Sequence, residues 1–303
     1  MKLRKYILTV MIGITAMTVL SSCANKENAV KGQPDQSTQE IFAMDTYMSL
    51  TAYGSNSEEA VNKAVQEINR LDAMFSVGNG DSDVTKLNEN GSGEVSEETA
   101  FIMNRAMQVS EKTNGAFDIT IYPLMELWGF TTKNYRVPES SEIAEALKGV
   151  SYTNVSVKGQ QVALTGGSSI DLGGIAKGYT SSRVIQIMKD YGIEHAIVNL
   201  GGNVQVLGTK TDGSDWRVAI QNPASENSYL GILSTTDKAV ITSGGYERYF
   251  EQDGQVYHHI IDTQTGYPSD SDLTSVTIVY SDGTTADALS TALFVKGLDG
   301  AKE

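Results

Sequence analysis

Asp287 and Thr291 are the residues whose types and spacing first suggest chemistry. They stand four positions apart within residues 282–295, so a helix that starts near Thr285 would place both side-chain oxygens on one face. A carboxylate and a hydroxyl, with carbonyl oxygens and a substrate phosphate, form the oxygen environment that Mg²⁺ prefers. A structural explanation stays open, because Thr284 and Asp287 have the spacing of a capping box and Thr291 could bond back to the preceding turn.

Two glycine-rich segments are candidates for ligand contact. Residues 169–178 (SIDLGGIAKG) have the pattern of a strand, a tight turn and a helix start, where free N–H groups and Lys177 favour phosphate. Their spacing matches neither a dinucleotide-binding fingerprint nor a Walker A loop, so an ordinary strand-to-helix turn explains them equally well. Residues 199–203 (NLGGN) lie between two expected strands, and a Gly-Gly hairpin turn is their simplest explanation.

Two of the three histidines, His258 and His259, stand beside Asp262 in residues 257–268 (YHHIIDTQTGYP). Successive residues of a strand face opposite ways, so at most one of the two points into a given site. A histidine titrates near neutral pH and can accept a proton from a hydroxyl. Asp262 could orient that histidine, but a turn-capping role explains this aspartate at least as well.

The elements that must position these residues alternate irregularly along the chain. Apolar spacing predicts helices at residues 57–71, 96–113, 140–147 and 175–191, with Ser96 suited to an N-cap and Gly192 to a C-cap. Strands are expected at residues 42–53, 155–157, 161–164, 195–199, 204–208, 216–220, 238–242, 257–261 and 273–279. Runs of strands with interspersed helices indicate an α+β fold, and no linker divides residues 41–303.

The N-terminus has the layout of a lipoprotein export signal. Residues 1–22 contain three basic residues and then an apolar run that is shorter than a membrane span. Leu20-Ser21-Ser22 precedes Cys23, the only cysteine, and resembles a bacterial lipobox in which Cys23 is lipidated. An ordinary signal peptide with an incidental cysteine is the alternative. Residues 23–40 are polar and are expected to form a disordered tether.

Composition excludes several classes of function. The chain has 303 residues, with 23 Lys and Arg against 37 Asp and Glu, a net charge of −14. Because nucleic-acid binding depends on Lys and Arg at phosphates, nucleic acid is not an expected partner. One cysteine excludes a disulfide framework and a cysteine-rich zinc site. Residues 1–22 hold three of the basic residues and no acidic one, so the processed chain would be more acidic still, at −17.

In their order and their amino-acid sequences, eight segments resemble the ApbE family of FAD:protein FMN transferases over residues 41–300. These segments are 44–46 (MDT), 115–118 (GAFD), 128–130 (WGF), 170–178 (IDLGGIAKG), 199–203 (NLGGN), 242–244 (TSG), 259–268 (HIIDTQTGYP) and 286–289 (ADAL). The resemblance implies a single ApbE-like, T-fold-like α+β domain. It also implies an enzyme that uses Mg²⁺ to split FAD, attaches FMN to a threonine of an acceptor protein and releases AMP.

The resemblance also implies roles for individual residues. Gly174 through its carbonyl, Asp287 and Thr291 would hold the metal, and His259 would activate the acceptor hydroxyl. The FAD contacts would come from Met44, Ala116, Phe117, Asp118, Asp171, Lys177 and Ile261. The acceptors implied are flavin-carrying subunits of Rnf or sodium-pumping NADH:quinone reductase complexes. The expected location is the extracytoplasmic face of the cell membrane, with palmitate or a similar acyl chain on Cys23 as the anchor.

Three departures from the family pattern affect these expectations. Thr263 stands where the family usually has proline, which should loosen that turn. Gly78 stands where the family often has a tyrosine that stacks on the flavin or adenine. The chain stops at Glu303, where family members usually continue, so a truncated C-terminus is expected. Two alternatives therefore remain: an FAD pyrophosphatase that releases FMN and AMP, and a non-catalytic FAD-binding lipoprotein.

Overall fold

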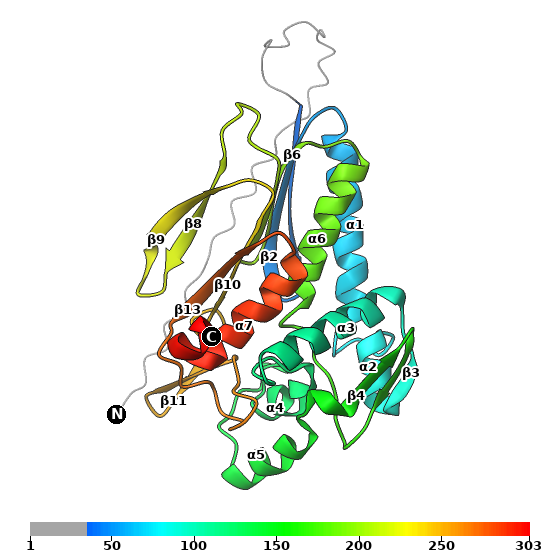
Figure 1. Cartoon of the computed structure of the whole chain (residues 1–303), viewed down its shortest axis with the longest axis vertical. Helices are drawn as coiled ribbons and strands as arrows, with labels where there is room; N and C mark the ends of the chain where they lie inside the picture. The colour runs from blue at the N-terminus through cyan, green and yellow to red at the C-terminus, as the bar shows by residue number, and fades with distance from the viewer. Residues whose placement is uncertain (1–34) are drawn as a thin grey trace, which may run out of the picture. The chain divides into compact units, whose positions relative to one another are not determined.

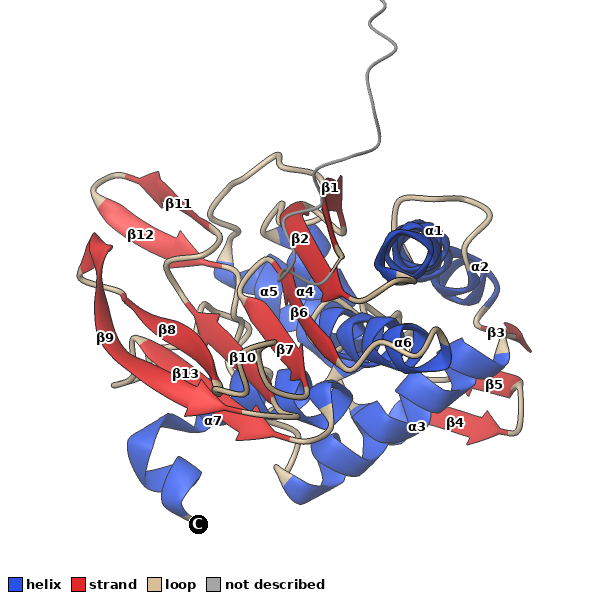
Figure 2. Cartoon of the chain, turned by 90° about the horizontal axis from the view of Figure 1, so that it is seen from above, coloured by secondary structure: helices blue, strands red, loops and turns tan. Residues whose placement is uncertain are grey.

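A six-stranded antiparallel sheet forms the centre of the fold in the computed structural model, which describes residues 35–303 (Figures 1 and 2). Its strand order is β1 (Gln36–Ala43), β2 (Thr46–Tyr53), β6 (His195–Leu200), β7 (Asn203–Leu207), β10 (Ala239–Gly244) and β13 (Ser275–Tyr280). β1–β2 and β6–β7 are hairpins, whereas β2 pairs with β6 and β10 with β13, so the sheet brings together segments that are separated in sequence. The α+β fold expected from the sequence is confirmed.

The single strand expected over residues 42–53 is wrong, because this stretch is part of a hairpin. β1 and β2 pair from Gln36 with Tyr53 to Ala43 with Thr46. Met44 and Asp45 form the turn and both have positive φ, 48° and 59°, a conformation that non-glycine residues rarely adopt. Since β1 begins at Gln36, the segment 23–40 expected as a tether contains part of a strand.

Three helices cover one face of the sheet: α1 (Ser57–Phe75), α6 (Ala176–Asp190) and α7 (Gly283–Lys302) (Figure 2). Helix α1 buries residues at helical spacing, among them Ala60, Val61, Ala64 and Ile68, against the alternate apolar residues of β2 and β6. Burying such stripes removes apolar surface from water and is the main stabilisation of the layer. Helices α1 and α6 confirm the expected helices at residues 57–71 and 175–191.

The opposite face of the sheet is covered by the hairpin of β8 (Trp216–Asn222) and β9 (Ser225–Thr235) (Figures 1 and 2). Trp216 and Val218 pack on Val206 and Val240. On β7, Val206 faces this hairpin while its neighbour Leu207 belongs to the helix-side core. This alternation along the strand lets one sheet carry two apolar cores.

The remaining elements pack around one end of the sheet. They include α3 (Glu97–Lys112), which Ser96 caps as expected by accepting the Thr99 N–H, and α5 (Ser140–Ala146). The other short elements are α2 (Asp83–Asn90), β3 (Ser92–Glu94), η1 (Ile119–Ile121), α4 (Tyr122–Leu127), η2 (Leu147–Gly149), η3 (Tyr152–Asn154), β4 (Val155–Lys158), β5 (Gln161–Leu164), β11 (Tyr249–Gln252) and β12 (Gln255–His258). The sequence did not predict α2, α4, β3, β9 or β11.

Local signals at helix ends agree with the sequence in one place and differ in another. Gly192 follows α6 with a left-handed φ of 73°, as expected for a C-cap. The capping box considered for Thr284 and Asp287 is wrong, because α7 begins at Gly283 and its N-cap is Asp282, whose side chain accepts the Thr284 N–H at 3.1 Å. Within residues 35–303, no helix combines the length and apolar character that crossing a membrane would require.

Candidate active site

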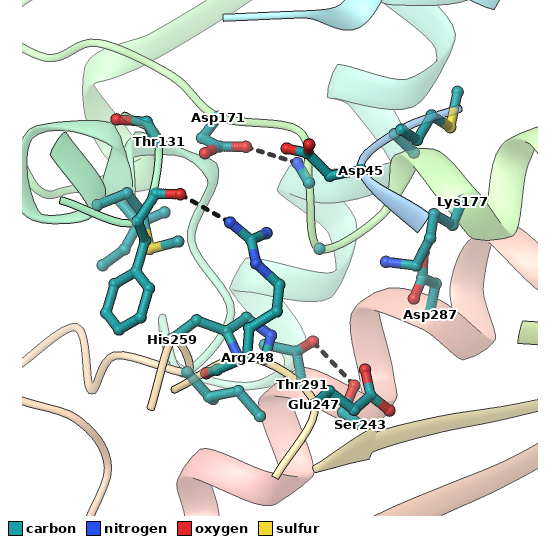
Figure 3. A pocket seen from close by; sticks show the side chains of 18 of the residues that line it. Asp45, Thr131, Asp171, Lys177, Ser243, Glu247, Arg248, His259, Asp287 and Thr291 are labelled. Carbon is teal, nitrogen blue, oxygen red and sulfur yellow. Dashed lines mark hydrogen bonds between the residues drawn. The ribbon is translucent and has the colours of Figure 1, made fainter. Parts of the chain in front are cut away.

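A cavity of about 450 Å³ lies where the N-termini of α6 and α7 meet the β1–β2 turn and the loops around β11 and β12 (Figure 3). Its volume falls in the usual range of small-molecule sites, roughly 300–1,000 Å³. All the site residues expected within residues 35–303 line it: Met44, Ala116, Phe117, Asp118, Asp171, Gly174, Lys177, His259, Ile261, Asp287 and Thr291. Cys23, the expected lipidation site, lies outside the described residues.

Asp287 is placed by a close crossing of α6 and α7. A Cβ on Gly178 would lie 2.2 Å from the Gly283 carbonyl oxygen and 2.5 Å from Asp287 Cβ, so only glycine allows this approach. The Gly178 N–H donates to Asp287 Oδ2 at 2.8 Å. Burial raises the pKa of Asp287, while Lys177, the Gly178 N–H and the amide of Asn203 lower it. The carboxylate therefore lies at the positive end of α6, which favours an anion there.

The other two expected metal ligands lie beside Asp287. Thr291 is one helical turn further along α7, and a Cβ built on Gly174 would lie 3.8 Å from Thr291 Oγ1. A carboxylate, a hydroxyl and a backbone carbonyl are all hard oxygen donors, as Mg²⁺ requires. No group of three or more His, Cys, Asp or Glu side chains in residues 35–303 is arranged to hold a metal. A cation here would therefore depend on this mixed oxygen set and on substrate oxygens.

The charges on the cavity wall also fit a divalent cation. Six carboxylates line the cavity, from Asp45, Asp72, Asp118, Asp171, Glu247 and Asp287, against only two cationic side chains, Lys177 and Arg248. A pyrophosphate that entered this site would meet an excess of negative charge. The donor set and the charge balance are therefore consistent with a bound metal ion that neutralises part of the negative charge of the cavity wall and of the pyrophosphate.

His259 lines the cavity and its tautomer follows from its hydrogen bond. Nδ1 lies 3.1 Å from the Arg248 carbonyl oxygen, and a carbonyl only accepts, so Nδ1 carries the proton and Nε2 keeps a free lone pair. Burial, together with the charges of Arg248 and Lys177, lowers the pKa of His259 to about 3. The imidazole is therefore neutral near pH 7 and available as a proton acceptor.

His258 and Asp262, which stand close to His259 in the sequence, have structural roles. His258 bonds to the Ser269 carbonyl oxygen at 3.1 Å and packs edge-on against Phe294, so it does not share the cavity. Asp262 does not orient the histidine: its Oδ1 accepts the Gln264 N–H at 2.7 Å, which is the turn-capping alternative. The turn is also tied by Thr263, whose hydroxyl donates to the Gly115 carbonyl oxygen at 2.7 Å. A proline could not make this bond, so the Thr263 hydroxyl fastens the turn by a contact that a proline ring would lack.

The carboxylates of Asp118 and Asp171 are already engaged. Asp118 accepts the Thr120 N–H and hydroxyl on Oδ1 and the Tyr152 N–H on Oδ2, at 2.6 to 2.8 Å. Asp171 accepts the Gly173 N–H at 2.7 Å and so shapes the glycine turn before α6 (Figure 3). Burial raises the pKa of both groups. Asp118 holds the 116–118 segment in place, and that segment's backbone borders the cavity.

Glu247 and Arg248 also line the cavity, and the sequence analysis missed both. Arg248 donates from Nη2 to the Phe130 carbonyl oxygen at 2.7 Å, which leaves other guanidinium N–H groups available (Figure 3). The side chain of Glu247 is exposed, yet partial desolvation by the surrounding protein raises its pKa to about 7, with Asp287 adding to the rise and Lys177 and Arg248 opposing it. The only signal in the sequence was that two charged residues follow the segment TSGGY at 242–246.

The fold and the cavity place this chain in a known family. The model of the ApbE family matches residues 44–303, so the chain belongs to the ApbE family.

Relatives named FAD:protein FMN transferase include one from Klebsiella pneumoniae, 34% identical over 81% of this chain and 78% of the relative. Another, from Treponema pallidum, is 32% identical over 85% of this chain and 78% of its own length. Among solved structures, the ApbE protein of Thermotoga maritima superposes with a TM-score of 0.82 at 40% identity, covering 86% of this chain and 87% of that one. The apo flavinyl transferase ApbE of Pseudomonas stutzeri gives a TM-score of 0.81 at 29% identity, covering 90% and 88%.

Proposed function

We propose that this chain is an FAD:protein FMN transferase that uses Mg²⁺ to move the FMN moiety of FAD onto a threonine hydroxyl of an acceptor protein, with AMP released. Membership of the ApbE family and its relatives of that name support the transferase activity. The observation that carries the proposal to these residues is their convergence on one cavity. Segments from residue 44 to residue 291 meet there.

Asp287, Thr291 and the Gly174 carbonyl are the residues that would hold Mg²⁺. The metal would supply charge neutralisation at the pyrophosphate and orient it for in-line displacement. Asp287 serves this role from a fixed position, because the Gly178 N–H and the α6–α7 crossing hold its carboxylate. Lys177 stands in the first turn of α6 and supplies a further positive charge to the phosphates.

His259 would accept the proton of the threonine hydroxyl on Nε2. Burial, and after it the positive charges of Arg248 and Lys177, disfavour the imidazolium form of His259 before substrate binds. An anionic pyrophosphate in the cavity would offset those two charges and raise the basicity of the imidazole. Proton transfer to His259 would thus be easier with FAD in place than without it.

The experiment that tests this function uses the full chain, FAD, Mg²⁺ and a separately purified acceptor domain. Covalent flavin on the acceptor, read from its mass and from in-gel fluorescence, is the expected result. Asp287→Ala should abolish the transfer, and Asp212→Ala, an exposed aspartate outside the cavity, should leave it unchanged. If AMP is released equally fast without acceptor and the acceptor gains no flavin, the protein is a pyrophosphatase and the transferase proposal is wrong.

We also propose a location and a class of partner. Cys23 would carry a palmitate or similar acyl chain that holds the protein at the extracytoplasmic face of the cell membrane. The lipobox wording of residues 20–23 and the sole cysteine of the chain support this proposal. The acceptors would be membrane-bound flavin-carrying subunits of the Rnf or sodium-pumping NADH:quinone reductase type, which a membrane-anchored enzyme meets in two dimensions rather than three.

A further inference from the structure

Three hydroxyl groups form a chain that ends on the backbone of α7. Ser290 Oγ donates to the Asp287 carbonyl oxygen at 2.8 Å. Ser243 Oγ, on β10, lies 2.7 Å from Ser290 Oγ. It also lies 3.3 Å from Thr291 Oγ1 (Figure 3). Ser290 is fully buried, so water offers it no other partner. The direction of each hydrogen bond in the chain can therefore be worked out.

A hydroxyl has one hydrogen and can donate only once. The Ser290 hydroxyl donates its hydrogen to a carbonyl oxygen, which can only accept, so Ser290 must accept a hydrogen bond from Ser243. The Ser243 hydroxyl then has no second hydrogen to donate, so its contact with Thr291 requires the Thr291 hydroxyl to donate. The hydrogen of Thr291 points at Ser243, and the lone pairs of Thr291 Oγ1 are left for the side where Gly174 and the cavity lie.

We propose that Ser243 is a positioning residue that turns the Thr291 hydroxyl into an acceptor aimed at the divalent cation. This inference rests on the proposed metal role of Asp287 and Thr291. Without Ser243, the Thr291 hydrogen could rotate toward the cavity, where it would oppose a cation. Losing such an outer contact to a metal ligand typically weakens metal affinity 10- to 100-fold. We expect about a tenfold loss, because Asp287 and the Gly174 carbonyl are unaffected.

Calorimetric titration of Mg²⁺ into the FAD-loaded protein without acceptor tests this role directly. Ser243→Ala should bind Mg²⁺ about tenfold more weakly than the unaltered protein, and Ser243→Thr, which restores a hydroxyl, should recover most of the affinity. Thr277→Val is the matched control: Thr277 shares a 2.8 Å hydroxyl contact with Thr242 in the same sheet and does not line the cavity. Its affinity for Mg²⁺ should not change.

Asp287→Ala separates the inference from the function on which it rests. If Asp287→Ala loses Mg²⁺ while Ser243→Ala binds it as tightly as the unaltered protein, the role of Ser243 is overturned and the metal site stands. If the unaltered protein binds no Mg²⁺, both proposals fail. The thermal midpoints of the metal-free variants show that folding is intact, so that a weaker affinity reports on the site.

A second, independent observation concerns Phe42. Four phenylalanines line the cavity, and Phe75, Phe117 and Phe130 are all buried, with 6% or less of their surface exposed. Phe42 is 57% exposed. Tyr47 supports it edge-on, with ring centroids 5.1 Å apart at 72°. Phe42 is thus the one phenylalanine that offers an open ring face at this cavity in the described part of the chain.

We infer that Phe42 stacks on a planar ring of the dinucleotide that the proposed function places in this cavity. Stacking of a base on an aromatic side chain is worth roughly 1–3 kcal/mol, so Phe42→Ala should weaken FAD binding at least about fivefold. Fluorescence titration with FAD and FMN, and calorimetry with AMP, show which ring is held. Phe42→Tyr should bind normally, as should Phe101→Ala, whose ring is 46% exposed away from the cavity. Unchanged affinity of Phe42→Ala for all three ligands would overturn the inference.

Discussion

At the scale of single residues, the hydrogen bonds and charges of the site are already fixed before any ligand binds. His259 donates from Nδ1 to the Arg248 carbonyl, and the Asp287 carboxylate accepts the Gly178 N–H. Groups fixed in this way lose little freedom when substrate binds, which is what lets a site stabilise a transition state rather than only a ground state. The same commitments make the residues sensitive to pH.

His259 should make the ligand-free protein less stable in acid. The folded-state pKa is about 3, against 6.5 for an unperturbed histidine. As the pH falls, the unfolded chain therefore takes up this proton first, so stability is lost between about pH 6.5 and pH 3. One such group changes the free energy of unfolding by at most about 1.4 kcal/mol per pH unit.

Urea unfolding of the unaltered protein and of His259→Gln at pH 7.5, 6.0 and 5.0 measures this effect. Glutamine keeps a donor for the Arg248 carbonyl but does not titrate, so the stability advantage of the unaltered protein should shrink as the pH falls. All other groups contribute equally to both proteins and cancel in the difference. A difference that stays constant with pH would show that His259 is not held neutral.

At the scale of elements, the decisive contact is the crossing of α6 and α7. Gly178 and Gly283 bring the two backbones so close that a Cβ on either one would lie within 3 Å of the other helix. This approach is what places a carboxylate of α7 on the N-terminus of α6. The β11–β12 hairpin has a comparable role, because Phe250 and Tyr257 stack in the aromatic cluster around Trp128 and hold Arg248 opposite His259.

Gly178→Ala should disturb both stability and the metal site. The new methyl group would push the helices apart, at a typical cost of about 1–3 kcal/mol for overpacking, and would lengthen the bond between the Gly178 N–H and Asp287. We expect a lower thermal midpoint together with weaker Mg²⁺ binding. Gly231→Ala is the control, because a Cβ at Gly231 meets nothing within 4 Å. Equal midpoints for the two variants would contradict the close-contact argument.

At the scale of the whole molecule, net charge sets conditions under which the site works, and the proposed acyl anchor bears on them too. The chain carries a net charge of −14, and the wall of the cavity repeats this excess of acid. Its substrate and any anionic membrane surface would both be repelled, so neither basic patches nor long-range steering brings the partners together. A divalent cation in the site and an acyl anchor at Cys23 would solve these two problems separately.

Cys23→Ser should release the protein from the membrane. Without the proposed acyl chain, the acidity of the protein disfavours binding to anionic lipid. Fractionation of cells fed an alkyne-labelled palmitate should find the unaltered protein labelled and in the membrane fraction. Ser22→Ala keeps a small residue before the cysteine and should behave the same. Labelled, membrane-bound Cys23→Ser protein would contradict lipidation at this residue.

The sequence by itself determined the α+β class, most of the helices and eleven of the residues that line the cavity. Amphipathic spacing marks α1 and α6 because one side of each helix must be buried, and ordered short motifs are visible without coordinates. The sequence did not reveal the turn inside residues 42–53, since Met44 and Asp45 adopt positive φ without a glycine to signal it. It also missed Glu247 and Arg248, whose importance comes only from the cavity that they face.

Tertiary structure alone excluded the capping box at Asp287 and the histidine contact of Asp262. Asp287 has the type of a capping residue, but the cap of α7 is Asp282, and the crossing of α6 turns Asp287 toward the cavity. Asp262 has the type of a histidine partner, but it caps its own turn while a backbone carbonyl 11 residues away from His259 takes the imidazole N–H. Which partner a side chain contacts depends on the distances between them, and those distances are set only when the chain has folded.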